Sequence, residues 1–178
     1  MCSSDLTLGE TCEMYQPKTI STKELVPDGP YPVFGANGII GRYNKFNHEE
    51  PQVLVTCKGA TCGSVNVSLP KSWITGNAMV IRPKDHALDL RFLEFVFRGG
   101  VDLSVAITGS AQPQITRTNL SPLLISFPVD IGEQIRLAET FQSLAAEIKH
   151  LTSIYERKLA ALEELKTSLL HQAFNGEL

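Results

Sequence analysis

Residues 130–178 read DIGEQIRLAETFQSLAAEIKHLTSIYERKLAALEELKTSLLHQAFNGEL, and neither proline nor glycine occurs between Glu133 and Phe174. Asp130 and Glu133 have the spacing of a capping box, in which two side chains satisfy the first amides of a helix. The segment therefore predicts one helix of about 40 residues, which at 1.5 Å per residue is about 60 Å long. Asn175-Gly176 supplies the stop signal.

Apolar residues recur along this helix in steps of three and four, which is a heptad seam with a stutter near Tyr155. A helix this long must pack against something, because an apolar stripe left in water is unfavourable. The simplest cover is a second copy of the same helix, so we expect a homodimer. The predicted dimerisation residues are Phe141, Leu144, Ile148, Leu151, Tyr155, Leu159, Leu162, Leu165 and Leu169.

The first 130 residues consist instead of short β-rich runs separated by turns. Asn37-Gly38 lies between the runs 31–34 and 39–43 and is a strong hairpin signal. One helix is predicted at 88–97, and further strands are predicted at 52–56, 64–69, 78–82 and 123–127. We therefore predict an α+β fold, with a globular strand-rich domain over residues 1–130 and one long C-terminal helix over residues 131–178.

The composition suits one domain with an appendage, because 43% of the 178 residues are apolar and 20% are charged. The net charge of −3 argues against a diffuse polycationic nucleic-acid binder but allows a local basic face. Residues 37–84 form such a segment, since six basic and two acidic side chains give it a net charge of +4.

Metal-binding and membrane classes are not indicated. Cys2, Cys12, Cys57 and Cys62 have no CxxC spacing and His48, His86, His150 and His171 are scattered, so no metal site is expected. No secretory signal is recognisable and no apolar stretch reaches 18 residues, so we expect no membrane span. The expected setting is the cytoplasm, with reduced thiols and with Cys57 and Cys62 as small buried hydrophobes.

The first candidate binding loop is residues 56–63, TCKGATCG. It places Lys58 and Thr61 among small residues at a turn between two predicted strands, where backbone can approach a phosphate or base edge closely. The alternative is an ordinary glycine-rich turn with a solvated lysine.

The second candidate is residues 108–116, TGSAQPQIT, which offer Ser110, Gln112 and Gln114. Glutamine can read adenine through two hydrogen bonds, and Pro113 stiffens the loop that presents it. A structural loop whose glutamines bond neighbouring backbone is the alternative. Weaker candidates, which a surface can also carry for solubility alone, are Asn77, Arg42, Tyr43 and Lys45.

Enzymatic signals are poor. Ser68 and Lys71 match S-x-x-K, but Pro70 blocks the helical turn that the motif needs. No Walker loop, nucleophile elbow or complete zinc-protease motif occurs. We therefore predict a non-catalytic protein.

Several segments, taken in order, resemble the target recognition domain of type I restriction-modification specificity (S) subunits. They are YPVFGANGIIG at 31–41, VLVTCKGATCG at 53–63 and GSAQPQI at 109–115. The tail, with EQIRLA at 133–138 and LEELKTSLLHQAFNGEL at 162–178, is similar to the helical spacer of that family. Their order and the long helix make the set specific.

The resemblance implies a domain that reads one half of a bipartite site in double-stranded DNA, together with spacer helices that pair antiparallel as a coiled coil. It also implies assembly with modification (adenine methyltransferase) subunits, which bind S-adenosylmethionine, and with restriction subunits; this chain would bind no cofactor. A full S subunit has two recognition domains and two spacer helices, so this sequence resembles a half-sized S subunit or the C-terminal half of a full one.

The competing hypothesis is a coiled-coil adaptor whose globular head binds protein instead of DNA. The acidic net charge favours this alternative slightly. Sequence-dependent DNA binding would separate the two hypotheses.

Overall fold

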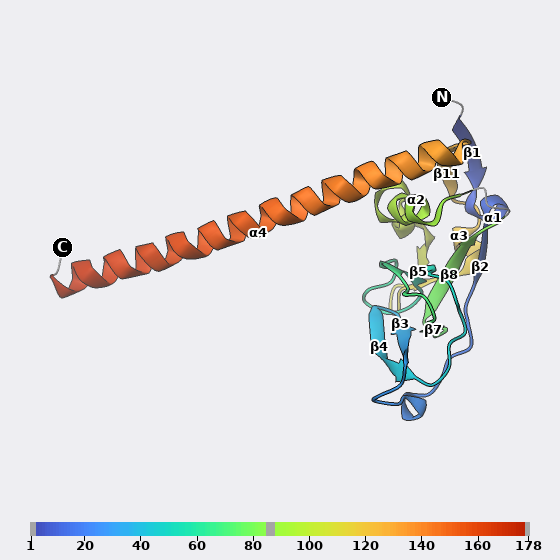
Figure 1. The fold of residues 1–178 in the computed structure, drawn as a ribbon, viewed down its shortest axis with the longest axis horizontal. Helices are drawn as coiled ribbons and strands as arrows, with labels where there is room; N and C mark the ends of the chain where they lie inside the picture. The colour runs from blue at the N-terminus through green and yellow to red at the C-terminus, as the bar shows by residue number, and fades with distance from the viewer. Residues whose placement is uncertain (1–2, 85–87, 177–178) are drawn as a thin grey trace. The chain divides into compact units, whose positions relative to one another are not determined.

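The computed structural model describes residues 3–84 and 88–176 of the chain (Figure 1). It divides into two compact units, Met1–Ala138 and Glu139–Leu178. Cys2 and His86, two residues considered above for a metal site, lie outside the described residues. Within the described ranges, no helix is long and apolar enough to cross a membrane.

The first unit is built around a four-stranded antiparallel sheet in the order β2-β8-β5-β6. Its strands are β2 (Cys12–Tyr15), β5 (Val53–Thr56), β6 (Val65–Val67) and β8 (Ala78–Pro83). All four residues of β5 are buried, as expected of a central strand covered on both faces.

A second sheet is formed by the predicted hairpin and a short parallel strand. The hairpin consists of β3 (Tyr31–Gly35) and β4 (Gly38–Tyr43), and β7 (Trp73–Ile74) pairs with β3 in parallel. The turn falls at Ala36-Asn37, where Gly38 adopts a φ of +107° that suits glycine. The hairpin prediction is therefore confirmed, with a β-bulge between Val33 and Phe34.

Two small ribbons complete the strands of this unit. β1 (Ser3–Thr7) pairs antiparallel with β11 (Leu124–Pro128), and β9 (Ile107–Thr108) pairs antiparallel with β10 (Gln114–Ile115). The short helices are α1 (Leu8–Thr11), α2 (Leu90–Phe95) and α3 (Arg117–Leu120), with 3-10 turns at Thr22–Glu24 and Leu103–Ala106. The helix predicted at 88–97 is thus shorter, and a π-type turn follows it at Val96–Gly100.

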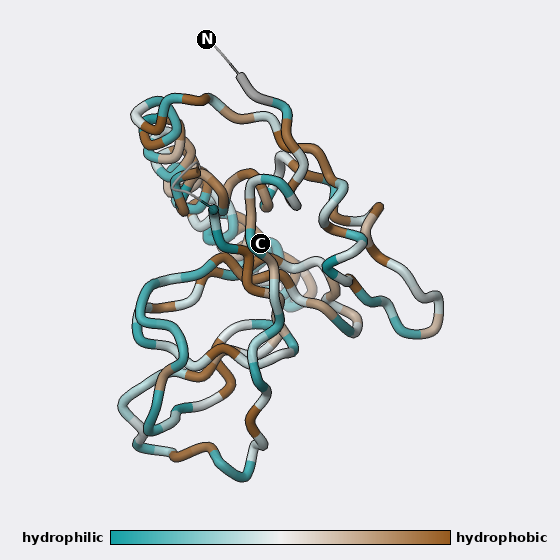
Figure 2. Tube along the Cα trace, turned by 90° about the vertical axis from the view of Figure 1, so that its right-hand side faces the viewer, coloured by the Kyte–Doolittle hydropathy of each residue, from teal (hydrophilic) through white to brown (hydrophobic). Residues whose placement is uncertain are grey.

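The core of the first unit joins the sheet to α2 and to the β1·β11 ribbon. Its main cluster includes Leu8, Val53, Ile81, Leu93 and Ile125, each at most 2% exposed. Figure 2 colours the chain trace by hydropathy and shows polar and apolar segments alternating along it. Single large apolar side chains of this size contribute about 1.5–3 kcal/mol each when fully buried.

The long helix α4 spans Ile131–Asn175, which confirms the predicted element. Asp130 begins it, because its carboxylate accepts a hydrogen bond from the Gly132 amide at 3.1 Å. The predicted division at residue 130 marks the start of α4, whereas the compact unit extends to Ala138. The reason is that the first turns of α4 bury Gln134 and Ala138.

Gln134 links three parts of the first unit through its side-chain amide. It is fully buried, its Oε1 accepts from the Asp89 amide at 2.8 Å, and its Nε2 donates to the Pro128 carbonyl at 2.8 Å. The side chain therefore ties the start of α4 to the N-terminus of α2 and to the end of β11.

Replacing Gln134 with Ala removes both bonds and leaves a backbone donor and a backbone acceptor without their partner. We expect the free energy of unfolding to fall by about 1–3 kcal/mol. Chemical denaturation of the full chain measures this difference. Gln142→Ala, the same change at an exposed site of α4, should alter stability by less than about 0.5 kcal/mol. Equal effects of the two changes would contradict the bridging role.

Candidate nucleic-acid interface

The two candidate loops of the sequence analysis lie against each other. After β5, the chain turns through residues 57–63, and the β9–β10 hairpin brings residues 109–115 beside it. The Gly59 amide donates to the Pro113 carbonyl at 3.1 Å, and the Ile115 amide donates to the Cys57 carbonyl at 2.9 Å. These bonds form an antiparallel bridge between Lys58 and Gln114. Residues 56 positions apart in sequence thus become neighbours.

The tip of the β3–β4 hairpin joins the same cluster. The Thr61 hydroxyl donates to the side-chain oxygen of Asn37 at 2.7 Å, and the Thr56 hydroxyl donates to the Ala36 carbonyl. Asn66 also donates to that carbonyl, at 3.3 Å. Three segments therefore form one surface, which we call the loop cluster: the turn 36–37 and the loops 57–63 and 109–115.

Glycine is required where the second loop reverses. Gly109 has a φ of +85°, and a Cβ at this position would lie 2.6 Å from the Gln112 carbonyl oxygen. Any other residue would strain the backbone or displace this carbonyl. The conformation of Gln112 thus depends on a glycine three residues earlier.

Several predicted site residues are exposed in the loop cluster: Lys58, Thr61, Ser110, Gln112 and Gln114. Lys58 forms no ion pair with any of the described residues, so its ammonium is available to an anion. The Thr61 hydroxyl is engaged with Asn37. The Asn77 side chain is exposed. The residue lies next to the loop cluster, because its carbonyl accepts a hydrogen bond from the Cys57 amide at 3.1 Å.

Arg42 and Tyr43 lie near the opposite end of the hairpin from its turn. Arg42 donates to the carbonyls of Gly29 and Pro30, and the Tyr43 ring packs edge-on against Trp73 at 5.3 Å between centroids. Lys45 is exposed in the loop that follows β4. The structure therefore does not bring these three residues to the loop cluster, and it gives two of them local structural partners.

A cavity of about 400 Å³ opens beside the Lys58–Gln114 bridge. Two cations, Lys58 and Arg117, line it together with the amides of Gln16 and Gln114, and no carboxylate does. Such a lining suits a phosphate oxygen or the acceptor edge of a base. The sequence analysis missed Arg117 and Gln16. Arg117 directly follows the quoted segment 108–116, so an extension by one residue would have found it, whereas Gln16 follows a strand that was not predicted.

A second cavity, of about 330 Å³, lies around Tyr15 and His48. The Tyr15 hydroxyl and His48 Nε2 are 2.8 Å apart and the rings stack at 5.9 Å between centroids. Burial, and then the charge of Arg82, lowers the pKa of His48. Burial also raises the pKa of Tyr15, against the effect of Arg82. Both shifts favour the neutral pair, which therefore serves to join β2 to the loop before β5.

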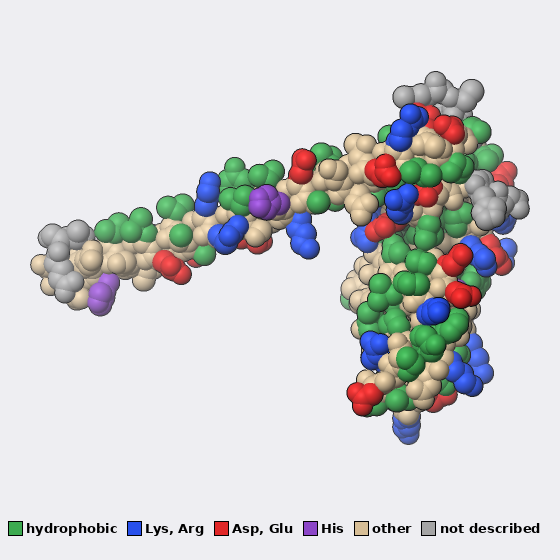
Figure 3. Space-filling model, in the orientation of Figure 1, with side chains coloured by type: hydrophobic (Ala, Val, Ile, Leu, Met, Phe, Trp, Pro, Cys, Tyr) green, Lys and Arg blue, Asp and Glu red, His purple; other side chains and the backbone are tan. Residues whose placement is uncertain are grey.

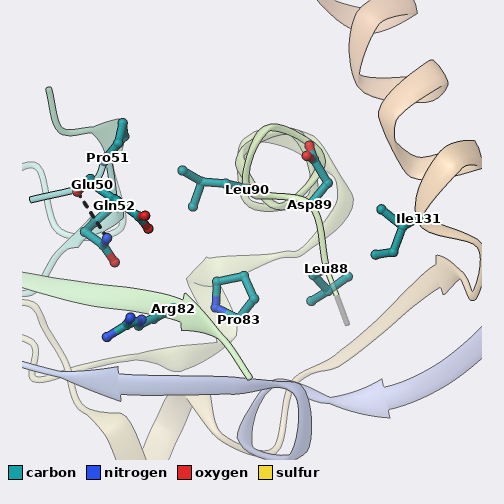
Figure 4. Close-up of a pocket in the computed structure, with 9 residues that line it drawn as sticks. All are labelled: Glu50, Pro51, Gln52, Arg82, Pro83, Leu88, Asp89, Leu90 and Ile131. Carbon is teal, nitrogen blue, oxygen red and sulfur yellow. Dashed lines mark hydrogen bonds between the residues drawn. The ribbon is translucent and has the colours of Figure 1, made fainter. Parts of the chain in front are cut away.

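A third cavity, of about 470 Å³, extends from Arg82 to α2 and the first turn of α4. Figure 4 shows Glu50, Gln52 and Arg82 on one side of it and Leu88, Leu90 and Ile131 on the other. Its two carboxylates, Glu50 and Asp89, make it less suited to a polyanion than the cavity beside Lys58.

The described cysteines are structural. Cys57 is fully buried in the core and Cys62 packs partly against it, which agrees with the interpretation of both as small hydrophobes. Burial is the main cause of a raised pKa at both thiols, so they remain protonated and unreactive at neutral pH. Among residues 3–84 and 88–176, no three His, Cys, Asp or Glu side chains are placed to hold a metal ion.

A strand-rich unit whose polar loops converge on one surface, continued by a long helix with an apolar stripe, defines a recognition module with a spacer helix. The comparisons assign this module to a family. The chain belongs to the type I restriction modification DNA specificity domain family, whose model matches residues 4–158.

Curated and solved relatives are of the same kind. The chain is 26% identical, over 83% of its length, to the type I restriction enzyme EcoprrI specificity subunit of Escherichia coli, and covers 38% of that protein. It resembles the S subunit of a type I restriction-modification system from M. genitalium at 20% identity with a TM-score of 0.70, covering 85% of this chain and 41% of that one.

Two further structures share the fold over almost the whole chain. The HsdS subunit of Thermoanaerobacter tengcongensis matches with a TM-score of 0.65 and 20% identity, over 99% of this chain and 46% of that one. A chain from work on complex assembly and conformational transition of the type I R-M system matches with a TM-score of 0.77 and 21% identity, with the same coverages of 99% and 46%. The chain thus spans less than half the length of these relatives, and the resemblance to S subunits found in the sequence is confirmed.

Proposed function

We propose that this chain is a DNA sequence-recognition subunit of a type I restriction-modification complex, and that its first unit reads one half of a bipartite site. The observation that supports the proposal most directly is the loop cluster, which gathers the family-like segments of the sequence on one surface. Lys58 and Arg117 supply positive charge there, and Gln112 and Gln114 supply amides that can pair with base edges.

Catalysis belongs to other subunits in this proposal. Modification subunits that bind S-adenosylmethionine carry out adenine methylation, and a restriction subunit, where one is present, cleaves. The chain itself binds double-stranded DNA and selects the site. Membership of the specificity family supports this division of roles.

The second unit is proposed to join two copies of the chain. The nine predicted seam residues, from Phe141 to Leu169, are 40–62% exposed, and Figure 3 shows apolar side chains along α4. We infer that a second α4 covers this seam in an antiparallel coiled coil. A two-fold dimer of identical recognition units reads identical half-sites in inverted orientation, so the target is an interrupted palindrome.

Mobility-shift assays with the cognate modification subunits test the proposed function. We expect tight, sequence-dependent binding of double-stranded DNA at moderate salt when those subunits are present. Methylome mapping of cells that express the chain with those subunits then gives the target. If the assembled proteins bound all sequences equally, the proposal of sequence-specific DNA recognition would be wrong and the adaptor hypothesis would be favoured.

Lys58→Ala should weaken DNA binding similarly for all sequences, because an exposed lysine contacts phosphates through its charge. The slope of log K against log salt should decrease by about one unit. Titrations at several salt concentrations measure this slope. Lys23→Ala, which removes an exposed cation outside the loop cluster, is the control and should leave the slope unchanged. An unchanged slope for Lys58→Ala would make Lys58 a solvated turn residue.

Gln112→Ala or Gln114→Ala should instead change specificity. If either amide reads a base edge, its loss removes about 1–3 kcal/mol of discrimination at one position of the site. Binding to a panel of single-base variants measures the effect, with Gln142→Ala as the control. A uniform loss at every site would mean that the glutamines only shape the loop.

Leu151→Asp should convert the dimer into monomers, because it places a charge in the middle of an apolar seam. Sedimentation velocity at micromolar concentration measures the change in mass. Ser153→Asp introduces the same charge at an exposed position outside the seam and should leave the dimer intact.

The dimer proposal has two further consequences. A wild-type monomer at micromolar concentration would contradict it directly. So would a methylated site with two unlike halves in cells where this is the only specificity chain, because two identical units cannot read different sequences.

A further inference from the structure

Two isoleucines form an exposed apolar pair beside the loop cluster. Ile39 and Ile40 follow the hairpin turn at the start of β4, and they are 56% and 49% exposed. Among the described residues of the first unit, they are the only large apolar side chains that are both exposed and consecutive in sequence. β4 is an edge strand, and edge strands usually carry charged residues that prevent unwanted pairing. Exposed apolar side chains gathered at such a place indicate a contact surface.

The hairpin backbone holds this isoleucine pair in place. Ile39 pairs with Phe34, whereas the β-bulge leaves Ile40 without a partner residue in β3. A bulge changes the direction in which its strand presents side chains. Ile40 lies over Gly35, since a Cβ at that glycine would be only 2.7 Å from Ile40 Cγ2. The missing side chain at residue 35 therefore gives Ile40 its position on the ribbon.

The turn before the isoleucine pair is anchored to the core of the first unit. The Thr56 hydroxyl and the Asn66 amide both donate to the Ala36 carbonyl, and the Thr61 hydroxyl donates to the side chain of Asn37. Thr56 belongs to β5 and is fully buried. The turn is thus fixed beside the loop cluster, and a partner that binds there has little backbone to order, which lowers the cost of binding.

The segments around the isoleucine pair contain no acidic residue. Residues 29–48, 51–84 and 103–129 have no Asp or Glu, although the whole chain has 19, and together they have seven Lys and Arg residues. These ranges include all three segments of the loop cluster. An apolar pair among cations and amides suits a partner that combines negative charge with apolar groups. This combination favours DNA, whose phosphates match the charge and whose thymine methyl groups offer apolar contact.

We infer that Ile39 and Ile40 pack against thymine methyl groups in the major groove and thereby help to select A·T base pairs. This inference rests on the proposed function and adds a class of base contact to it. The methyl group of thymine is the apolar feature that the major groove displays, and cytosine lacks it.

The shape of the hairpin favours the major groove. This groove is about 12 Å wide and admits a two-stranded β-ribbon, whereas the minor groove is only about 6 Å wide. The turn is slim, because residues 35–38 read GANG. Ile39 and Ile40 belong to the strand that follows, so they lie on the flank of the ribbon, where base edges would pass. A wedge between base pairs would instead need a large apolar side chain in the turn itself.

Removal of single methyl groups from the DNA tests this contact. The chain, assembled with its modification subunits, is titrated with its mapped target and with duplexes in which one thymine at a time is replaced by deoxyuridine. Uracil pairs as thymine does but lacks the methyl group. For the wild-type chain we expect an affinity loss of about three- to tenfold at one or two thymines, which corresponds to one buried methyl group.

Variants of the isoleucine pair connect this loss to the hairpin. The double variant Ile39→Ala with Ile40→Ala should bind the thymine and uracil duplexes equally. Changing both residues to Val keeps branched apolar side chains and should retain most of the discrimination. Leu69→Ala is the matched control and should discriminate as the wild type does. Leu69 is 51% exposed and follows Ser68, whose amide donates to the Gln52 carbonyl at the end of β5 that is remote from the loop cluster.

Three other results would each overturn the methyl contact. A wild-type chain that bound every uracil duplex as tightly as the target would read no methyl group. If binding in those titrations were still sequence-dependent, the proposed function would stand, and if it were not, both would fail. Equal methyl discrimination by the wild type and the alanine double variant would place the readout elsewhere in the complex. Unchanged DNA binding by that variant, with weaker assembly with the modification subunits in sedimentation, would make the isoleucine pair a protein contact.

Discussion

Two backbone hydrogen bonds, from Gly59 to Pro113 and from Ile115 to Cys57, hold the two long loops of the loop cluster together. They attach the β9–β10 hairpin to the end of β5, one of the two central strands of the main sheet. Cys57 is fully buried at this point, so the attachment is anchored in the core and not only at the surface.

Local sequence patterns predicted the elements whose signals are complete within a few residues. The hairpin turn at Asn37-Gly38, the runs around β5 and β8, and the helix α4 each carry their own propensity and spacing. The sequence analysis missed β1 and β2, because these strands of four or five residues are stabilised by pairing with residues far away in the sequence. Ser3–Thr7 pairs with Leu124–Pro128, more than 100 residues away. Helix α2 ends at Phe95, before the predicted end at residue 97, because the chain continues into a π-type turn that reaches Gly99-Gly100.

The candidate site was predictable to a similar degree. Residue types alone singled out Lys58 and the glutamine loop, but nothing in the sequence indicated that the two loops are hydrogen-bonded neighbours. Arg42 and Tyr43 were predicted as site residues, but the fold does not bring them to the loop cluster. A positive charge beside an aromatic ring suggested a contact surface, whereas both side chains have structural partners within the hairpin region. Arg117 lies one residue beyond the quoted segment, and the fold places it beside Lys58 in one cavity.

In the proposed function, an acidic chain must bind DNA through the placement of its cations and not through its total charge. The chain has a net charge of −3, and Lys58 and Arg117 line the cavity beside the loop cluster, so in the proposed function these placed cations would supply the phosphate contacts. In the proposed dimer, two units joined through α4 would gain affinity, because binding of the first raises the effective concentration of the second. That gain requires a fixed spacing between the two units. In the proposed dimer a rigid helix pair provides it, whereas a flexible linker would spread the second unit over many positions.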